Sequence, residues 1–257
     1  MDHGLGNMPN AYHYSNTFDD ALAAQFKGVL SMGFDPRQID DLRLWLDITN
    51  PKTLQIDSSN GIALVQDRSS LGNNAAQSNA SLRMQYAANG INGKSAIHAT
   101  ATNQQLQIPD HASLRFSDAY TMFMVVLYAS DNNNWPVLYS KTSNYGTIAD
   151  GYGMRLHLNS EDKFVSWGAQ GGIATINGVE ASANVNTFKA ITINTPYIFS
   201  STNSAVITTP SVASIIGGQG PDFYIGEIII YGRALSTAIR KQVEAYLSAK
   251  WNIAIQV

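Results

Sequence analysis

The carboxylates of this chain are few and are poorly spaced for cleaving glycosidic bonds. The sequence contains four glutamates, Glu161, Glu180, Glu227 and Glu244. Glycoside hydrolysis uses two carboxyl groups about 5 to 9 Å apart, which residues i and i+2 of one strand can supply on one face. Glu161 precedes Asp162 directly, so on a strand the two face opposite ways, and Glu227 has no carboxylate within four residues. A pair assembled from distant segments stays open, but we assign no catalytic residue and expect a protein that is not an enzyme.

Other catalytic and metal-binding patterns are equally weak. The histidines lack spacings such as His-x-x-x-His, and the chain has no cysteine, so we expect no zinc site and no disulfide. No Gly-x-Ser-x-Gly elbow occurs, although a Ser/His/Asp triad built from distant segments stays open. We therefore expect no metal and no cofactor, with calcium held by Asp and Asn oxygens as an alternative.

One region combines aromatic rings with amide and carboxylate groups, a mixture that suits sugar binding. The candidate ligand-binding residues are Trp135, Tyr139, Tyr145, Asp150, Tyr152 and Trp167. In loops between strands they would form a glycan site. The competing interpretation makes Trp135, Tyr139 and Trp167 core anchors, because large aromatic side chains are usually buried for packing.

Residues 34–232 show the pattern of strands, with period-two alternation at 42–46 and 154–158 and a continuous β-rich run at 121–128. The clearest are expected at 42–46, 121–128, 154–158, 188–193 and 223–231, with shorter ones at 136–140, 163–167, 197–200 and 213–217. Asparagine-rich turns are expected at 73–74, 89–90, 92–93 and 177–178. Almost no helical period separates these strands, so the pattern predicts an all-β antiparallel sandwich and not a βαβ fold.

The N-terminal segment, residues 1–33, has a different character. It begins without any period, and a helical pattern starts at Thr17 and ends at Gly33. Its candidate partner-docking residues are Tyr12, Tyr14, Phe18, Leu22 and Phe26. Docking on another protein and packing on the chain's own body both remain possible, because apolar stripes commonly mean ordinary packing. We treat residues 1–33 as an arm and residues 34–257 as the body.

The helical period returns at residues 236–251. Ser236 is a natural N-cap for this helix. The apolar stripe consists of Ile239, Val243, Tyr246, Leu247 and Trp251, and the polar side is expected to hold Arg240, Lys241, Glu244 and Lys250. We expect this helix to close one edge or end of the sandwich.

Composition narrows the choice of partners. Charged residues make up 14% of the chain and the net charge is −3, so no basic face is expected for nucleic acid or an anionic membrane. The N-terminus lacks the basic and apolar regions of a secretory signal, and the longest apolar run, residues 122–129, is too short to span a membrane. We expect a protein made in a cytoplasm that binds neither nucleic acid nor membrane.

Two parts of the chain, one at the start of the body and one at its end, carry recognisable motifs. At the start, FDPRQIDDLRLWLDITNPKTL occupies residues 34–54 and VQDRSSLGNNAAQ occupies 65–77; at the end, FYIGEIIIYGRALSTAIRKQVEAYLSAKWNI occupies 223–253. These parts resemble concanavalin A-like lectin/glucanase domains of the laminin-G-like type, which show, in the same order, an LxLWLDA strand, an xWxDxSGxxNxAxQ turn and a GxIxEIIIYxRxLS strand before a VExYLxxKW helix. Gln66 departs from this pattern, since tryptophan is common there. The resemblance implies a jelly roll over residues 34–253.

Domains similar to this chain occur in tailed-bacteriophage virion proteins, commonly behind a short N-terminal segment. The resemblance implies a structural or adhesion role in the virion, as capsid decoration or as a tail, baseplate or fibre protein, attached to other virion proteins through residues 1–33. A homo-oligomer is expected because virion sites are symmetric. The alternatives are a carbohydrate-binding adhesin that recognises host surface glycans and a glycoside hydrolase, since fold alone does not fix function.

Overall fold

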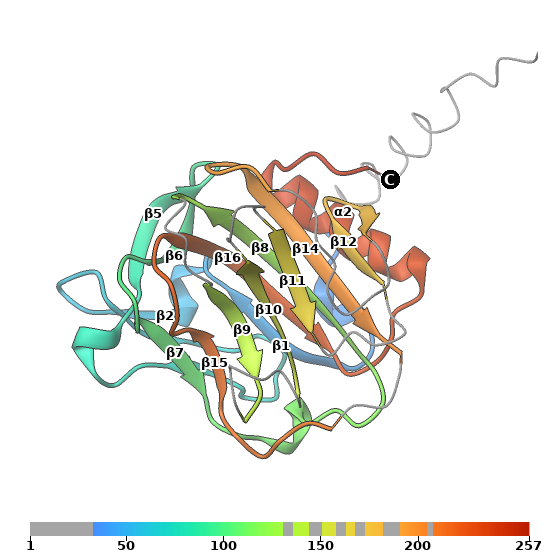
Figure 1. The fold of residues 1–257 in the computed structure, drawn as a ribbon, viewed down its shortest axis with the longest axis horizontal. Coiled ribbons are helices and arrows are strands. Elements are labelled where there is room, and N and C mark those ends of the chain that lie inside the picture. The colour runs from blue at the N-terminus through green and yellow to red at the C-terminus, as the bar shows by residue number, and fades with distance from the viewer. Residues whose placement is uncertain are drawn as a thin grey trace, which may run out of the picture.

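The described residues form two stacked antiparallel β-sheets, with a long helix packed on the outside (Figure 1). The computed structural model describes residues 33–130, 136–143, 151–157, 163–167, 173–181, 191–204 and 208–256, with the backbone alone at 155–157, 163–167 and 181. Within these residues each sheet has eight strands. The predicted all-β sandwich is therefore confirmed. None of the described helices is long and apolar enough to cross a membrane.

Sheet A contains the strands that lie next to the long helix. Its order is β13 (Val179–Ala181), β12 (Ala174–Ile176), β14 (Pro196–Asn203), β8 (Tyr120–Tyr128), β16 (Phe223–Tyr231), β6 (Lys94–Ala99) and β5 (Gln85–Ile91), and β1 (Leu42–Asp47) also pairs with β16. Sheet B has the order β11 (Lys163–Trp167), β10 (Tyr152–His157), β9 (Val137–Lys141), β15 (Ser214–Gly217), β7 (Gln105–Ile108), β4 (Ala75–Ala76), β3 (Ile62–Val65) and β2 (Leu54–Ile56). The described 3-10 helices are η1 (Pro36–Gln38), η2 (Pro51–Thr53), η3 (Ala80–Leu82) and η4 (Ala112–Leu114).

The central strands β8 and β16 hold the molecule together. They pair antiparallel along their whole length, and nearly all their residues are buried. Because side chains alternate between faces, Met124 and Ile228 pack between the sheets, whereas Phe123 and Ile229 point outward. A strand covered on both faces needs apolar residues throughout, which explains the continuous apolar runs in the sequence.

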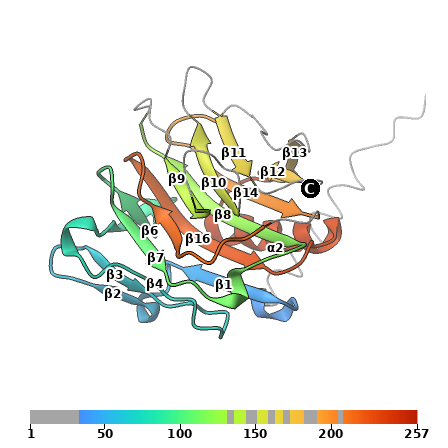
Figure 2. The same ribbon diagram turned by 60° about the horizontal axis from the view of Figure 1, so that its bottom comes forward.

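Helix α2 (Thr237–Trp251) covers the outward face of sheet A, as Figure 2 shows. The Ser236 side chain accepts a hydrogen bond from the Ile239 amide and so caps its first turn, as predicted. At the other end the chain turns at Asn252, with φ 53°. The side-chain amide of Asn92, at the tip of the β5–β6 hairpin, donates to the Trp251 and Asn252 carbonyls. These bonds satisfy carbonyl groups that a helix end otherwise leaves open.

Gly226 divides β16 and lets α2 come close. The register between β16 and β8 shifts between Ile225 and Glu227. A Cβ atom at Gly226 would lie 2.4 Å from a ring carbon of Trp251, so no other residue fits without displacing the helix. This glycine therefore marks both a bulge in β16 and a close contact with the helix.

The loop after β3 is organised by Asp67. The Asp67 carboxylate accepts hydrogen bonds from the amides of Trp45, Ser69 and Asn73, and the Asn74 side chain accepts one from the Asp67 amide. One side chain thus joins the loop to β1.

Two local predictions are wrong. The described part of the predicted strand 188–193 is not a strand: Thr195 donates to the Thr192 carbonyl in a turn with Asn194 at φ 59°, and β14 begins at Pro196. Residues 188–190 lie outside the described residues. Residues 89–90, where a turn was expected, belong to β5, whose register with β6 shifts between Ala87 and Ile91. The chain reverses at Asn92–Gly93, where both φ angles are positive, and this second predicted turn is confirmed.

Candidate functional site

The predicted ligand-binding residues Tyr139 and Tyr152 lie inside the sandwich. Both are fully buried on neighbouring strands of sheet B, and their hydroxyl oxygens are 3.2 Å apart. Tyr139 donates to the Ser214 hydroxyl and Tyr152 to the Leu114 carbonyl. Burial raises the pKa of Tyr139 to about 12. Neither ring offers a face to a ligand, so their assignment to a glycan site is wrong: strand alternation turns both rings into the core.

The remaining predicted site residues are not described well enough to be tested. Trp135, Tyr145 and Asp150 lie outside the described residues, and Trp167 is placed on β11 by its backbone alone. The docking residues of the arm, Tyr12, Tyr14, Phe18, Leu22 and Phe26, also lie outside the described part.

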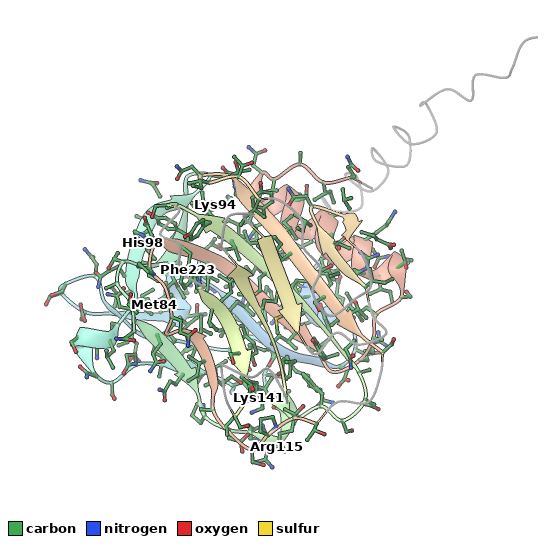
Figure 3. The ribbon with its side chains drawn as sticks, viewed as in Figure 1. Met84, Lys94, His98, Arg115, Lys141 and Phe223 are labelled. Carbon is green, nitrogen blue, oxygen red and sulfur yellow. The ribbon has the colours of Figure 1, made fainter. Side chains whose placement is uncertain are left out.

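A buried lysine lies at one end of sheet B, close to Arg115 (Figure 3). The Lys141 ammonium, fully buried, donates to Asp110 at 2.9 Å and to the Val212 carbonyl at 2.6 Å. Asp110 also accepts from Arg115. The Arg115 and Lys141 contacts lower the pKa of Asp110 to about 2, whereas burial lowers the pKa of Lys141. These contacts neutralise the buried ammonium and connect β9 to the segments that carry Asp110 and Val212.

Glu227 is a buried carboxylate on the outward face of β16. Its carboxylate is fully buried and accepts four contacts: from the indole nitrogens of Trp45 at 2.7 Å and Trp251 at 2.8 Å, from the Tyr246 hydroxyl at 2.9 Å, and from the Lys250 ammonium at 2.8 Å. Three of these partners come from α2. Burial and the negative charge of Glu227 raise the pKa of Tyr246 well above its usual value. Glu227 thus joins β1, β16 and α2.

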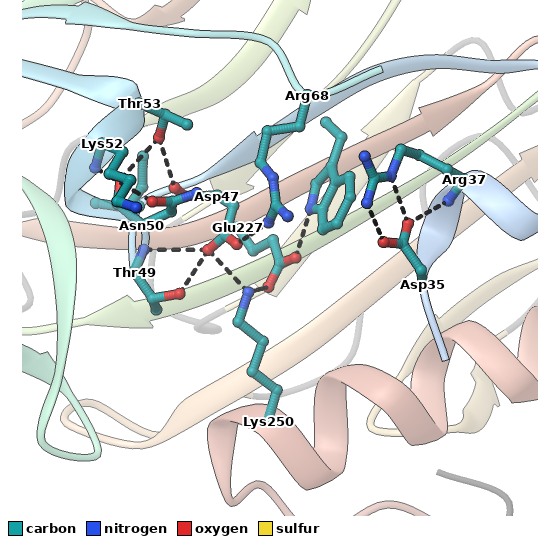
Figure 4. A network of polar contacts seen from close by, with 12 residues as sticks. Asp35, Arg37, Asp47, Thr49, Asn50, Lys52, Thr53, Arg68, Glu227 and Lys250 are labelled. Carbon is teal, nitrogen blue, oxygen red and sulfur yellow. Dashed lines mark hydrogen bonds and ion pairs between the residues drawn. The ribbon is translucent and has the colours of Figure 1, made fainter. Parts of the chain in front are cut away.

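A second carboxylate extends this network to the surface (Figure 4). Lys250 bridges Glu227 and Asp47, with its ammonium 2.8 Å from an oxygen of each. Asp47 also pairs with Arg68, whose guanidinium lies 3.7 Å from the centre of the Trp45 ring. Burial pushes the pKa of Asp47 upward, but the contacts with Lys250, Thr49 and Arg68 outweigh it and leave the pKa below its usual value. The two carboxylates, Glu227 and Asp47, are therefore balanced by two cations, Lys250 and Arg68.

Helix α2 is anchored at its other half by Glu244, which corrects the predicted polar face. Arg240 and Glu244 were expected on the solvent side, yet both are buried. One oxygen of Glu244 accepts from Thr175, Ser200 and Arg240, because strands β12 and β14 present hydroxyl groups under this part of the helix. The other oxygen, Oε2, is buried with no hydrogen-bond partner among the described residues. Arg240 also contacts the exposed Glu180.

One histidine lies at the edge of the helix-covered face. His98 stacks on Tyr224 with ring centres 3.9 Å apart, and its Nε2 is 3.1 Å from Asp222. In the part of the chain that the structure describes, no group of three or more His, Asp or Glu side chains converges as metal ligands do.

Sequence reasoning overlooked the Lys141–Asp110 pair and the burial of Arg240 and Glu244, because no local pattern marks them. The polar clusters among the described residues stabilise the packing of α2 on sheet A and of β9 on its neighbouring segments.

Comparison with known proteins places the chain by structure alone. No protein-family model matches it, and no curated protein sequence does. Among solved structures, the binding domain of Paraclostridial Mosquitocidal Protein 1 is similar with a TM-score of 0.52 at 14% identity, over 82% of this chain and 52% of that chain. Trypanosoma rangeli sialidase is similar with a TM-score of 0.51 at 11% identity, over 93% of this chain and 40% of that one. This chain therefore spans about half, or less, of the proteins it resembles.

These similarities define the class of fold. The chain is an antiparallel β-sandwich of the kind found in a toxin binding domain and in a sialidase chain. At such identities the likeness concerns the fold alone.

Proposed function

We propose that this chain is a non-enzymatic attachment module of a tailed-phage particle. Residues 1–33 dock on other virion proteins, and the sandwich is displayed as capsid decoration or as part of a tail, baseplate or fibre. The observation that carries the non-enzymatic part is the use of Glu227 and Glu244, which are buried and hold α2 against sheet A. The resemblance of the opening and closing segments to phage virion domains supports the location.

Deleting residues 1–33 tests the attachment. We expect the truncated protein to keep its sandwich, as judged by circular dichroism, and to incorporate into purified particles at least about tenfold less than the full chain, since the arm supplies the docking contacts. Phe18→Ala with Phe26→Ala should lower incorporation similarly, whereas Asn7→Ala with Asn10→Ala serves as the matched control within the arm. Incorporation of the truncated protein at the full-length level would show that the body docks by itself.

Incubation with polysaccharides tests the non-enzymatic part. We expect the chain length of host-surface polysaccharides to stay unchanged during prolonged incubation with the protein, because the two described buried glutamates cannot reach a substrate. Shortened chains would establish a hydrolase and would end this proposal.

Glycan recognition is the second candidate function. Its support is the fold shared with a toxin binding domain and a sialidase, together with the candidate residues Trp135, Tyr145 and Asp150. Binding on a glycan array that is lost in Trp135→Ala and kept in Tyr224→Ala, an aromatic control on sheet A, would favour an adhesin. An array without binding would leave attachment as the single role.

A further inference from the structure

The arm joins the body beside helix α2. Gly33 is the first described residue, and the ring of Phe34, which follows it, lies 5.5 Å from the ring of Tyr246 on α2, measured between ring centres. The Pro36 carbonyl accepts a hydrogen bond from the Tyr231 hydroxyl of β16, so the start of the body is fixed against sheet A. Residues 1–32 therefore connect to the body on the side that α2 covers.

The expected docking segment reaches this junction without a linker. The helical pattern of the arm starts at Thr17 and ends at Gly33. In a helix that continues to Gly33, Phe26 and Phe34 are about 12 Å apart along the axis. A protein that binds Phe26 therefore lies within about one helix diameter, roughly 10–12 Å, of the side of α2 that Phe34 contacts.

That side of α2 is apolar and partly exposed. Phe34, Ile239 and Tyr246 pack at the edge of the core under the helix and keep part of their surface accessible. Gln242 is exposed and lies one helical turn from both Ile239 and Tyr246, so it shares their side of the helix. These four residues, Phe34, Ile239, Gln242 and Tyr246, are called the α2 flank below.

The charges next to the α2 flank are neutralised within the body. Arg37 pairs with Asp35, and Lys250 pairs with both Asp47 and Glu227. The centre of a protein–protein interface is depleted of charged residues and enriched in aromatic ones. A flank of this kind therefore fits an uncharged apolar groove on a protein.

We propose that the arm and the α2 flank form one continuous docking surface, which binds an apolar groove on the virion protein that holds the arm. The docking residues of the arm, from Tyr12 to Phe26, are far fewer than the about 20–30 residues that a stable interface uses on each side. The α2 flank adds the rings of Phe34 and Tyr246 to them. This inference rests on the proposed attachment through residues 1–33 and assigns the body its share of the contact.

Single cysteines test the α2 flank, since the chain has none of its own. Gln242→Cys reports on the flank. Gln107→Cys is the matched control, because Gln107 is exposed on β7 and faces away from the inter-sheet core that Leu106 and Ile108 enter. In purified particles Gln242→Cys should react with a maleimide at least about tenfold more slowly than in the free protein, whereas Gln107→Cys should react equally fast in both.

Arginine variants at the same two positions test whether the contact contributes to attachment. Gln242→Arg should lower incorporation into particles at least about fivefold, because it places an unpaired charge against an apolar groove. Gln107→Arg should be incorporated at the wild-type level. Both positions are exposed, and circular dichroism of the free variants checks that the sheets are retained.

Failure of this inference is distinguishable from failure of the attachment itself. If Gln242→Cys is incorporated but reacts as fast in particles as in solution, or if Gln242→Arg is incorporated fully, the α2 flank is not a contact and attachment through the arm still stands. Absence of the full-length protein from particles ends both proposals. Slow labelling of Gln242→Cys already in the free protein also overturns the inference, and faster labelling after deletion of residues 1–33 would then identify the arm as the cover.

Discussion

Replacing Glu227 by glutamine tests how much one buried carboxylate contributes to the docking of α2. Glu227 accepts from Trp45, Trp251, Tyr246 and Lys250. An amide has one acceptor oxygen, so Glu227→Gln satisfies two of these donors and turns its own NH2 group toward the other two. Hydrogen bonds to a charged group contribute about 1.5–3 kcal/mol each, and Lys250 also loses one of its two carboxylates. We expect a loss of about 3–5 kcal/mol in the free energy of unfolding, the range for breaking a buried ion pair.

Urea and thermal unfolding measure this loss. For a chain of this length 1 kcal/mol lowers Tm by about 2–4 °C, so Glu227→Gln should unfold roughly 10 °C below the wild type. Glu180→Gln is the matched control, because Glu180 is 59% exposed and its ion pair should contribute about 0.5 kcal/mol or less. A loss below about 1 kcal/mol in Glu227→Gln would refute the reasoning, since α2 would then be held by its apolar contacts alone.

Three further substitutions probe contacts that position the same elements. Asp110→Asn leaves the Lys141 ammonium without its carboxylate and should lower the free energy of unfolding by about 2 kcal/mol in urea at pH 7. Because the pKa of Asp110 is about 2, that deficit should shrink as the pH falls from about 4 toward 2; a constant deficit would contradict the ion pair. Gly226→Ala should lower Tm by several degrees through its clash with Trp251, and an unchanged Tm would show that the helix can move aside. Asn92→Gly keeps the turn but removes the helix cap and should cost about 1 kcal/mol by chemical denaturation, whereas no loss would mean that water replaces the amide.

The fold was predictable where local sequence and tertiary environment agree. In β16 the run of isoleucines around Glu227 requires apolar cover on both faces, and the structure provides it with sheet B on one side and α2 on the other. Ser236 and Asp67 were predictable for a similar reason, because each satisfies backbone amides within a few residues.

The polar interior was not predictable, because it depends on groups far apart in the sequence. Arg240 and Glu244 show the i, i+4 spacing of an exposed helical ion pair, and the helix alone cannot reveal that Thr175 and Ser200 lie beneath it. Similarly, the ring of Tyr139 points inward because of the way β9 pairs with β10 in sheet B. The sequence of the connecting loop does not specify that pairing.

The aromatic residues of the described body restrict where a sugar can stack. The indole groups of Trp45 and Trp251 point to Glu227 in the interior. Partly exposed Tyr224 has one ring face covered by His98 and also lies against Gly90, so it lacks the open platform that ring stacking needs. The glycan proposal therefore depends on the candidate residues outside the described part, above all Trp135 with Tyr145, and the expected result is that Trp135→Ala abolishes any binding seen on an array. Binding that survives this change would move recognition away from the aromatic loops and onto hydrogen bonds alone.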